Sequence, residues 1–344
     1  MCANRYRELM KIKKGTAVEF QRHDSACAVF PDLGGRVFAE VCGLSMHRVD
    51  LECVARPNRP FNNFGGGNFW PAPEGGKFAF NYLGNRWCVQ ECINDQPFEV
   101  ASRTGDGALL QKRIRLINRA GTSLDTLMKR DLKVLAVLPT FLGGYRIRGS
   151  LCYQTMDSFE VLDPLPIDQA LIAAWTLEQF EPSASTISFC SVPNPESAIN
   201  FDFYDHPGDR ISYYRHGFTY KTDGLRKGQI GVKKAAGATF IGFYDLAQGL
   251  LCTRENKSQD GSLYFNMADN DQPAGPFSAS DNYSIFNSDP EMNAFELELI
   301  SGACVADGKL TGSELVSVTT FALFERSEDI QDFVEKYVGK GKTC

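Results

Sequence analysis

Short segments in which apolar and polar residues alternate recur along most of the chain. In YRIRGSLCY (145–153), the apolar side chains fall on one face of an extended chain and the arginines on the other. A period of two is typical of a half-buried β-strand. The same pattern, bounded each time by Gly, Pro, Asn or Asp, predicts further strands at 25–30, 36–41, 76–82, 108–117, 186–190, 199–204, 238–244, 262–266, 293–300 and 313–324.

Helical periodicity is confined to the two ends of the chain. In SEDIQDFVEKYVGKG, Ser327 suits an N-cap, Ile330 to Val338 carry one apolar stripe, and Gly339 ends the pattern. This predicts a helix at about 327–338 that covers one sheet edge. A weaker helical pattern at 4–12 lies within an N-terminal extension of about 1–14.

The number of strands and the absence of a convincing linker or repeat predict one all-β domain over residues 1–344, built from two large antiparallel sheets. With 43% hydrophobic and 23% charged residues, the 344-residue chain resembles an ordinary soluble protein with a sizeable core. The net charge of −6 and the absence of a basic run argue against nucleic acid as a partner.

The amino terminus and the hydropathy of the chain favour a cytoplasmic protein as the sequence is given. No apolar run approaches the roughly 18 residues that cross a bilayer, and the first residues lack the apolar segment of a signal peptide. If a signal segment was trimmed and Met1 added, Cys2 would instead be the lipid-carrying residue of a periplasmic or surface lipoprotein.

No motif requires a cofactor. The eleven cysteines form no CxxC pair, and the four histidines lie in separate segments without the i, i+2 or i, i+4 spacing of a metal site. We therefore expect neither a disulfide framework nor a transition-metal centre.

The segment GGGNFWPAPEGG (65–76) is rich in turn-forming residues and predicts a long loop that carries Trp70 and ends near Glu74. An aromatic face beside a carboxylate is a common way to hold a sugar, because apolar ring faces stack while hydroxyl groups need polar acceptors. The alternative is a loop in which Trp70 plugs one end of the sandwich and Glu74 caps backbone amides.

The segment NAFELELI (293–300) is the second candidate. In a strand, Glu296 and Glu298 share one face, with carboxylates about 6 to 7 Å apart. Mutual repulsion in an enclosed place raises the pKa of one carboxyl toward the working range of a general base. The alternative is a strand face that simply points to solvent.

Three further segments contain candidate residues. His216, in YYRHGFTYK, is surrounded by aromatic and basic residues and is either a general acid or an exposed structural histidine. Trp175 and Gln179, in AWTLEQFEPS, belong either to a sugar platform or to the core. Lys221 and Arg226 flank a TDG turn, and this region lacks the Lys-Ser/Thr of a phosphate-binding loop.

Five segments, taken in order over about residues 25–325, resemble an uncharacterised bacterial family of the galactose-mutarotase-like, or aldose epimerase-like, superfamily. They are DLGGRVFAEV, GGGNFWPAPEGGKFAF, LIAAWTLEQFEPS, KGQIGV and FELELISGACVADGKLTGSELVSVTTFAL. The resemblance implies a β-supersandwich of two large antiparallel sheets with a concave face that binds carbohydrate. Arg36, Trp70 and Glu74 match positions that are characteristic of the family.

In the aldose mutarotases of this superfamily, a Glu on a late strand removes the proton of the anomeric hydroxyl and a His protonates the ring oxygen. The resemblance matches the late Leu-Glu to Leu297 and Glu298, which makes Glu298 the expected base, with Glu296 beside it. The stretch nearest to the histidine motif reads AAWTLEQF and contains no histidine. The acid would then come from His216, Glu74 or Lys221.

The sequence thus predicts a carbohydrate-active protein that binds a mono- or oligosaccharide and acts as an aldose 1-epimerase-like isomerase. The candidate catalytic residues are Glu298, Glu296, His216 and Glu74, and the candidate substrate-binding residues are Arg36, Trp70, Lys77, Trp175, Gln179, Lys221 and Arg226. The alternatives are a non-catalytic carbohydrate-binding accessory protein and a glycan lyase, in which Arg36 and Lys77 would neutralise a substrate carboxylate.

Overall fold

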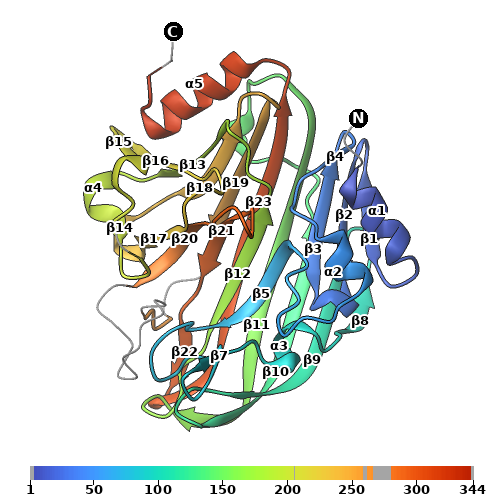
Figure 1. The fold of residues 1–344 in the computed structure, drawn as a ribbon, viewed down its shortest axis with the longest axis vertical. Coiled ribbons are helices and arrows are strands. Elements are labelled where there is room, and N and C mark those ends of the chain that lie inside the picture. The colour runs from blue at the N-terminus through green and yellow to red at the C-terminus, as the bar shows by residue number, and fades with distance from the viewer. Residues whose placement is uncertain (1–3, 205, 259–261, 266–279, 342–344) are drawn as a thin grey trace.

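The computed structural model describes residues 4–204, 206–258, 262–265 and 280–341. Two large antiparallel sheets lie face to face, and a two-stranded hairpin and a few helices lie around them (Figure 1). The largest buried apolar cluster contains side chains of both sheets, so the core lies between them. This arrangement is the predicted β-supersandwich.

The first sheet has the strand order β1-β2-β3-β5-β12-β21-β20-β17-β14, with β4 paired to β3. Its strands are β1 (Val18–Arg22), β2 (Ser25–Phe30), β3 (Arg36–Val41), β4 (Leu44–Ser45), β5 (Gly66–Ala72), β12 (Ala173–Phe180), β14 (Ile199–Asn200), β17 (Gly228–Lys233), β20 (Asp281–Asn287) and β21 (Phe295–Ile300).

The second sheet has the order β15-β16-β13-β18-β19-β23-β11-β10-β9-β8, with β22 paired to β23. Its strands are β8 (Glu99–Arg103), β9 (Gly107–Ile117), β10 (Ser123–Val134), β11 (Ile147–Pro166), β13 (Thr186–Ser191), β15 (Ile211–Tyr214), β16 (Gly217–Lys221), β18 (Phe240–Asp245), β19 (Leu250–Asn256), β22 (Ala303–Ala306) and β23 (Lys309–Phe324). The separate hairpin pairs β6 (Tyr82–Leu83) with β7 (Arg86–Trp87).

Five α-helices lie around the sheets within the described residues. They are α1 (Arg5–Ile12), α2 (Leu51–Ala55), α3 (Glu91–Asn94), α4 (Pro195–Ala198) and α5 (Ser327–Val338). In Figure 1, α1 and α2 lie beside β2 and β3 at the right of the view, and α5 lies at the top. Within the described ranges, none of the helices combines the length and the apolar content needed to cross a membrane.

The predicted C-terminal helix is confirmed, but two of its details differ. Its N-cap residue is Arg326, which forms an ion pair with Asp329, because Ser327 is already helical. Phe333 packs against Phe189 and Phe240, so α5 covers the face of the second sheet rather than one of its edges.

Most predicted strands coincide with observed strands, and three predicted strands differ from the structure. Residues 76–81 form an irregular connection, and the predicted strand at 199–204 ends after Asn200. In the predicted strand at 262–266, Leu263 forms only an isolated bridge to Ala303, and residue 266 lies outside the described residues, as does Cys2.

The predicted loop at 65–76 is wrong for its first half, because β5 is an inner strand between β3 and β12. Its glycines serve close packing rather than chain reversal. Gly66 has a φ of 74°, and a Cβ there would lie 2.6 Å from the Phe38 ring. A Cβ on Gly67 would lie 3.2 Å from the side chain of Glu178. Such positions favour glycine because it has no Cβ.

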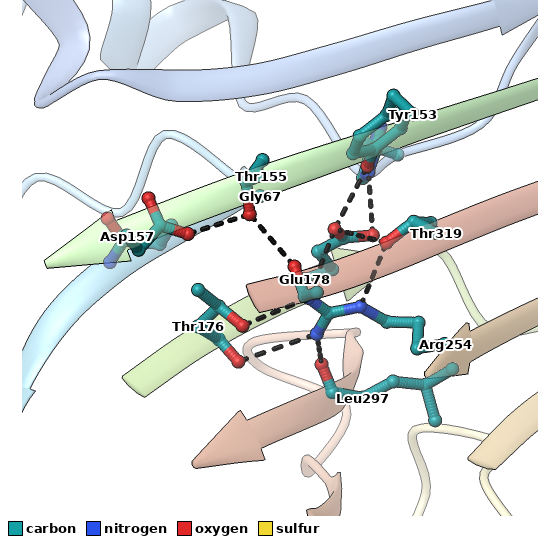
Figure 2. Close-up of polar contacts among 12 residues, drawn as sticks. Gly67, Tyr153, Thr155, Asp157, Thr176, Glu178, Arg254, Leu297 and Thr319 are labelled. Atoms are coloured by element: carbon teal, nitrogen blue, oxygen red, sulfur yellow. Dashed lines mark hydrogen bonds and ion pairs between the residues drawn. The ribbon is translucent and has the colours of Figure 1, made fainter. Parts of the chain in front are cut away.

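Two buried arginines of the second sheet reach across the core and hold the strands of the first. Arg254, on β19, donates to the carbonyl oxygens of Thr176 (3.4 Å) and Leu297 (2.5 Å), and its guanidinium lies 3.2 Å from Glu178 (Figure 2). Arg130, on β10, donates to the carbonyl oxygens of Gly67 (2.9 Å) and Asn68 (3.3 Å). These hydrogen bonds fix the main chains of β5, β12 and β21 from the core side of the first sheet.

The carboxylate of Glu178 is well satisfied in this core. Tyr153 and Thr319 each donate to its Oε1 at 2.9 Å, and the His47 ring nitrogen lies 3.4 Å from its Oε2. Burial alone raises a carboxyl pKa, but the charge of Arg254 and these hydrogen bonds dominate and lower the pKa of Glu178 to about 2. The carboxylate therefore stays ionised opposite the guanidinium.

Replacing Arg254 by Met should lower the free energy of unfolding by about 3–5 kcal/mol, because it leaves the Glu178 carboxylate buried without its cation. Urea denaturation followed by circular dichroism measures the change. Arg115→Met is the matched control, since Arg115 pairs with Asp125 on an exposed strand face, where an ion pair contributes little. Equal stability of Arg254→Met and the unmodified protein would contradict this role of Arg254.

Candidate functional site

A cavity of about 480 Å³ opens on the face of the first sheet that points away from the core. Its volume lies in the range of roughly 300–1,000 Å³ that is usual for small-molecule sites. Aromatic side chains form much of its wall: Phe61, Trp70, Tyr82, Trp87, Trp175, Tyr204 and Phe286. The polar lining residues are Asn63, Asn68, Glu74, Gln179, Lys227, Gln229, Glu296 and Glu298.

Strand alternation sorts the side chains between the cavity and the core. On β12, Trp175 and Gln179 line the cavity, whereas Glu178 points into the core toward Arg254. On β21, the two glutamates line the cavity and the leucine between them is fully buried. Because successive side chains of a strand point to opposite faces, one set of strands builds both the cavity floor and the core beneath it.

The two carboxyl groups predicted to share a face do so at the base of this cavity. Glu298 is 1% exposed and Glu296 is 7% exposed. Gln179 Nε2 donates to Glu296 Oε1 at 2.7 Å. Trp175 Nε1 donates to Glu298 Oε2 at 3.1 Å, and Gln229 Nε2 donates to the same oxygen at 3.0 Å. Both carboxyls are therefore held in fixed orientations rather than exposed to solvent.

The surroundings of the two carboxyls differ in charge. Burial raises the pKa of Glu298 well above its usual value, and the neighbouring charges of Glu296 and Glu74 raise it further. Burial also raises the pKa of Glu296, but the bond from Gln179 and the positive charges of Arg48 and Arg36 oppose the increase. When one of two close carboxyls of this kind is ionised, its charge raises the pKa of the other, and the surroundings favour Glu298 as the one that keeps its proton.

Trp70 lies at the centre of the aromatic wall. Its ring meets those of Trp175 at 6.3 Å and Phe61 at 5.6 Å, in both cases edge to face. The side chain is 6% exposed, and its Nε1 is a buried donor without a hydrogen-bond partner among the described residues. Because buried donors are almost always satisfied, this unpartnered N–H is an exception among the described residues.

Arg36 does not line the cavity but forms hydrogen bonds that hold neighbouring parts of the site in place. Its guanidinium is 1% exposed and donates to the Gly65 carbonyl at 2.9 Å and to the side-chain oxygens of Asn68 and Asn94, each at 3.0 Å. Burial lowers its pKa to about 9. Its hydrogen bonds fix the start of β5 and the orientation of Asn68.

Four other candidates also lie outside the cavity lining. His216 is exposed in the turn between β15 and β16, where its backbone N–H donates to the Val338 carbonyl of α5. Lys221 is exposed at the end of β16, 3.3 Å from a carboxylate oxygen of Asp223. Lys77 donates to a backbone carbonyl at 3.4 Å, and Arg226 is exposed before β17.

Sequence reasoning missed several lining residues. Gln229 was quoted within KGQIGV but given no role, although alternation along β17 separates it from the buried Ile230. No sequence pattern identifies Trp87 or Tyr82 as lining residues, because it is the position of the short β6–β7 hairpin in the fold that brings them to the cavity. Among the described residues that line the cavity, Lys227 is the one cationic side chain.

Metal binding has no support in the described ranges, where no group of three or more His, Cys, Asp or Glu side chains is arranged to hold an ion. The cavity can hold a ligand of moderate size between aromatic faces and can give and take protons through its carboxyl pair.

Glu298→Gln should stabilise the protein increasingly as the pH rises above about 4.3, until the folded-state pKa of Glu298 is passed. The pKa of Glu298 is raised in the folded state above an unfolded value of about 4.3. The unmodified protein therefore loses stability above that pH, until the folded pKa is passed, whereas neutral Gln carries no such cost.

Urea denaturation at several pH values tests this prediction. Glu314→Gln on the exposed side of β23 is the control and should show no pH-dependent gain. If the free energies of unfolding of Glu298→Gln and the unmodified protein differ by the same amount from pH 5 to 8, the pKa of Glu298 is not raised in the folded state.

Solved structures with a similar fold include proteins with mutarotase-like names. The Slr1438 protein from Synechocystis sp. PCC 6803 aligns with a TM-score of 0.55 and 13% identity, over 89% of this chain and 96% of its own. A galactose mutarotase related enzyme from Lactobacillus acidophilus aligns with a TM-score of 0.50 and 9% identity, over 90% of this chain and 99% of its own. A galactose mutarotase-like protein from Lactobacillus casei aligns with a TM-score of 0.45 and 10% identity, over 90% and 99% of the two chains.

At these identities the likeness concerns the fold, which is galactose mutarotase-like. No curated protein matches the sequence. The family described as "Family of unknown function (DUF6786)" matches residues 4–304. The chain belongs to this family.

Proposed function

We propose that the cavity binds a reducing sugar and interconverts its anomers by acid–base chemistry, as an aldose 1-epimerase-type isomerase does. The observation that carries the proposal is the pair of buried carboxyls, Glu296 and Glu298, at the base of an aromatic-lined cavity. Apolar sugar faces stack on aromatic rings, and acid–base chemistry at the anomeric centre needs one group that takes a proton and one that gives it.

The different surroundings of the two carboxyls divide these roles. Glu298, which lies closer to other negative charges, carries the proton and is the acid. Glu296, which accepts a hydrogen bond from Gln179 and senses the positive charges of Arg48 and Arg36, is the base. This reverses the sequence-based expectation of Glu298 as base, and it removes the need for a histidine, since two carboxyls with separated pKa values can supply both functions.

The proposed reaction returns the site to its starting state. Glu296 takes the proton of the anomeric hydroxyl as the C1–O1 double bond forms, the C1–O5 bond breaks, and Glu298 gives its proton to O5. Rotation about the C1–C2 bond presents the other face of the aldehyde. O5 then attacks C1 from that face and returns its proton to Glu298, Glu296 gives the proton it holds back to O1, and the other anomer leaves.

Four further residues of the cavity hold the reacting sugar or Glu298 in this scheme. Trp175 and Gln229 orient Glu298, and the ring of Trp70 forms part of the wall against which the sugar packs. Glu74 adds negative charge near Glu298 and so favours its protonated form. A lyase has no comparable support, because Arg36 is committed to backbone and amide oxygens and Lys77 does not line the cavity.

Glu298→Gln and Glu296→Gln should each reduce anomer exchange by roughly a hundred- to ten-thousandfold, the usual contribution of a general acid or base. Exchange spectroscopy by proton NMR on equilibrated glucose and galactose measures the rate directly. Glu314→Gln should retain full activity. Sugar binding by the unmodified protein without exchange above the buffer rate would contradict the proposed catalysis and favour the non-catalytic binding protein.

Neutral sugars should be better substrates than their 6-phosphates. The lining contributes the carboxylates of Glu74 and Glu296 against the single cation Lys227 within the described residues, while Glu298 carries its proton, so a phosphate dianion meets a net negative field. The ratio of kcat/KM for glucose and glucose 6-phosphate tests this preference, and Glu74→Gln should narrow it. Preference for the phosphate would overturn this electrostatic argument.

A further inference from the structure

Aromatic rings form a continuous line from the buried carboxyls to the protein surface. Trp175, which is 2% exposed, donates its N–H to Glu298 and meets Trp70 at 6.3 Å. Trp70 meets Phe61 at 5.6 Å, and Phe61 meets Trp87 at 5.7 Å. All four side chains line the same cavity. The line therefore begins at the proposed reacting centre and ends at the cavity mouth.

The outer end of this line is unusually exposed. Trp87 is 42% exposed on the β6–β7 hairpin, where it pairs with Tyr82, which also lines the cavity. An exposed Trp at the mouth of a cavity is a feature of surfaces that bind a partner or ligand, because a large apolar ring gains from being covered.

The ring geometry leaves aromatic faces available. Neighbouring rings along the line meet at interplanar angles of 66° to 82°, so none of these contacts is a parallel stack. Midway along the line, the buried Nε1 of Trp70 lacks a hydrogen-bond partner among the described residues. Phe61 and the exposed Trp87 thus extend the aromatic wall of the cavity beyond Trp70.

We infer that the ligand is a neutral reducing oligosaccharide of at least two units. Its reducing-end unit lies over Glu296 and Glu298, and the next unit lies against Phe61 and Trp87 at the mouth. The inference rests on the proposed function for the position of the reducing end. It adds an outer subsite formed by the hairpin and names the class of substrate.

Trp87→Ala tests the outer subsite without touching the acid–base pair. We expect KM for reducing disaccharides and trisaccharides of glucose and galactose to rise about five- to tenfold, as expected for the loss of one aromatic contact, with kcat unchanged. KM and kcat for free glucose and galactose should stay at the unmodified values, and Trp87→Tyr should restore most of the oligosaccharide affinity. Tyr213→Ala, an exposed aromatic on β15 outside the cavity, is the matched control.

Calorimetric titration with the same sugars separates this inference from the proposed function. Tighter binding of the oligosaccharides that is lost in Trp87→Ala supports the outer subsite even if no anomer exchange occurs, in which case the proposed catalysis fails alone. Exchange of monosaccharides with no affinity gain for longer sugars, or equal loss for short and long sugars in Trp87→Ala, overturns the outer subsite and leaves the proposed catalysis standing.

Discussion

The arrangement of the site depends on one buried contact between the sheets, in which Arg254 of the second sheet meets Glu178 of the first. Ions removed from water are costly unless they are paired and hydrogen-bonded, and here the guanidinium also donates to the main chains of β12 and β21. These two strands carry Trp175, Gln179 and both cavity glutamates on their opposite faces. Because strand side chains alternate, fixing Glu178 and Leu297 toward the core fixes the direction of the cavity side chains.

The same sheet therefore holds buried carboxyls of two kinds. Glu178 has a cation, a tyrosine and a threonine as partners, and its low pKa of about 2 means that its ionised form contributes stability, which is lost only as the pH falls from about 4.3 toward 2. Glu298 has another carboxyl as its neighbour, and its raised pKa means that ionisation costs stability. A well-satisfied pair on the core side thus supports a strained pair on the cavity side, as is common where a fold carries acid–base chemistry.

Sequence patterns predicted the architecture well because alternation reports which face of a strand is buried. They placed Glu296 and Glu298 together for the same reason, and the resemblance pointed to Glu298. The glycines of β5 were misread as a loop, because the need for close packing against Phe38 and Glu178 is visible only in three dimensions. His216 has a side chain suited to acid–base chemistry, but it lies in an exposed turn outside the cavity lining. No local sequence pattern points to Trp87, because long-range chain reversals decide which surface residues reach the cavity.

The central claim is that the two cavity carboxyls differ in pKa, with Glu298 the one that keeps its proton to higher pH. Carbon-13 NMR of protein labelled at the glutamate side-chain carboxyl tests it most directly, with the two signals assigned by single substitution to Gln. The account predicts that the Glu298 signal moves to the chemical shift of a carboxylate at a higher pH than the Glu296 signal does. Titration of both signals together near the ordinary glutamate pKa of about 4.3 would contradict it.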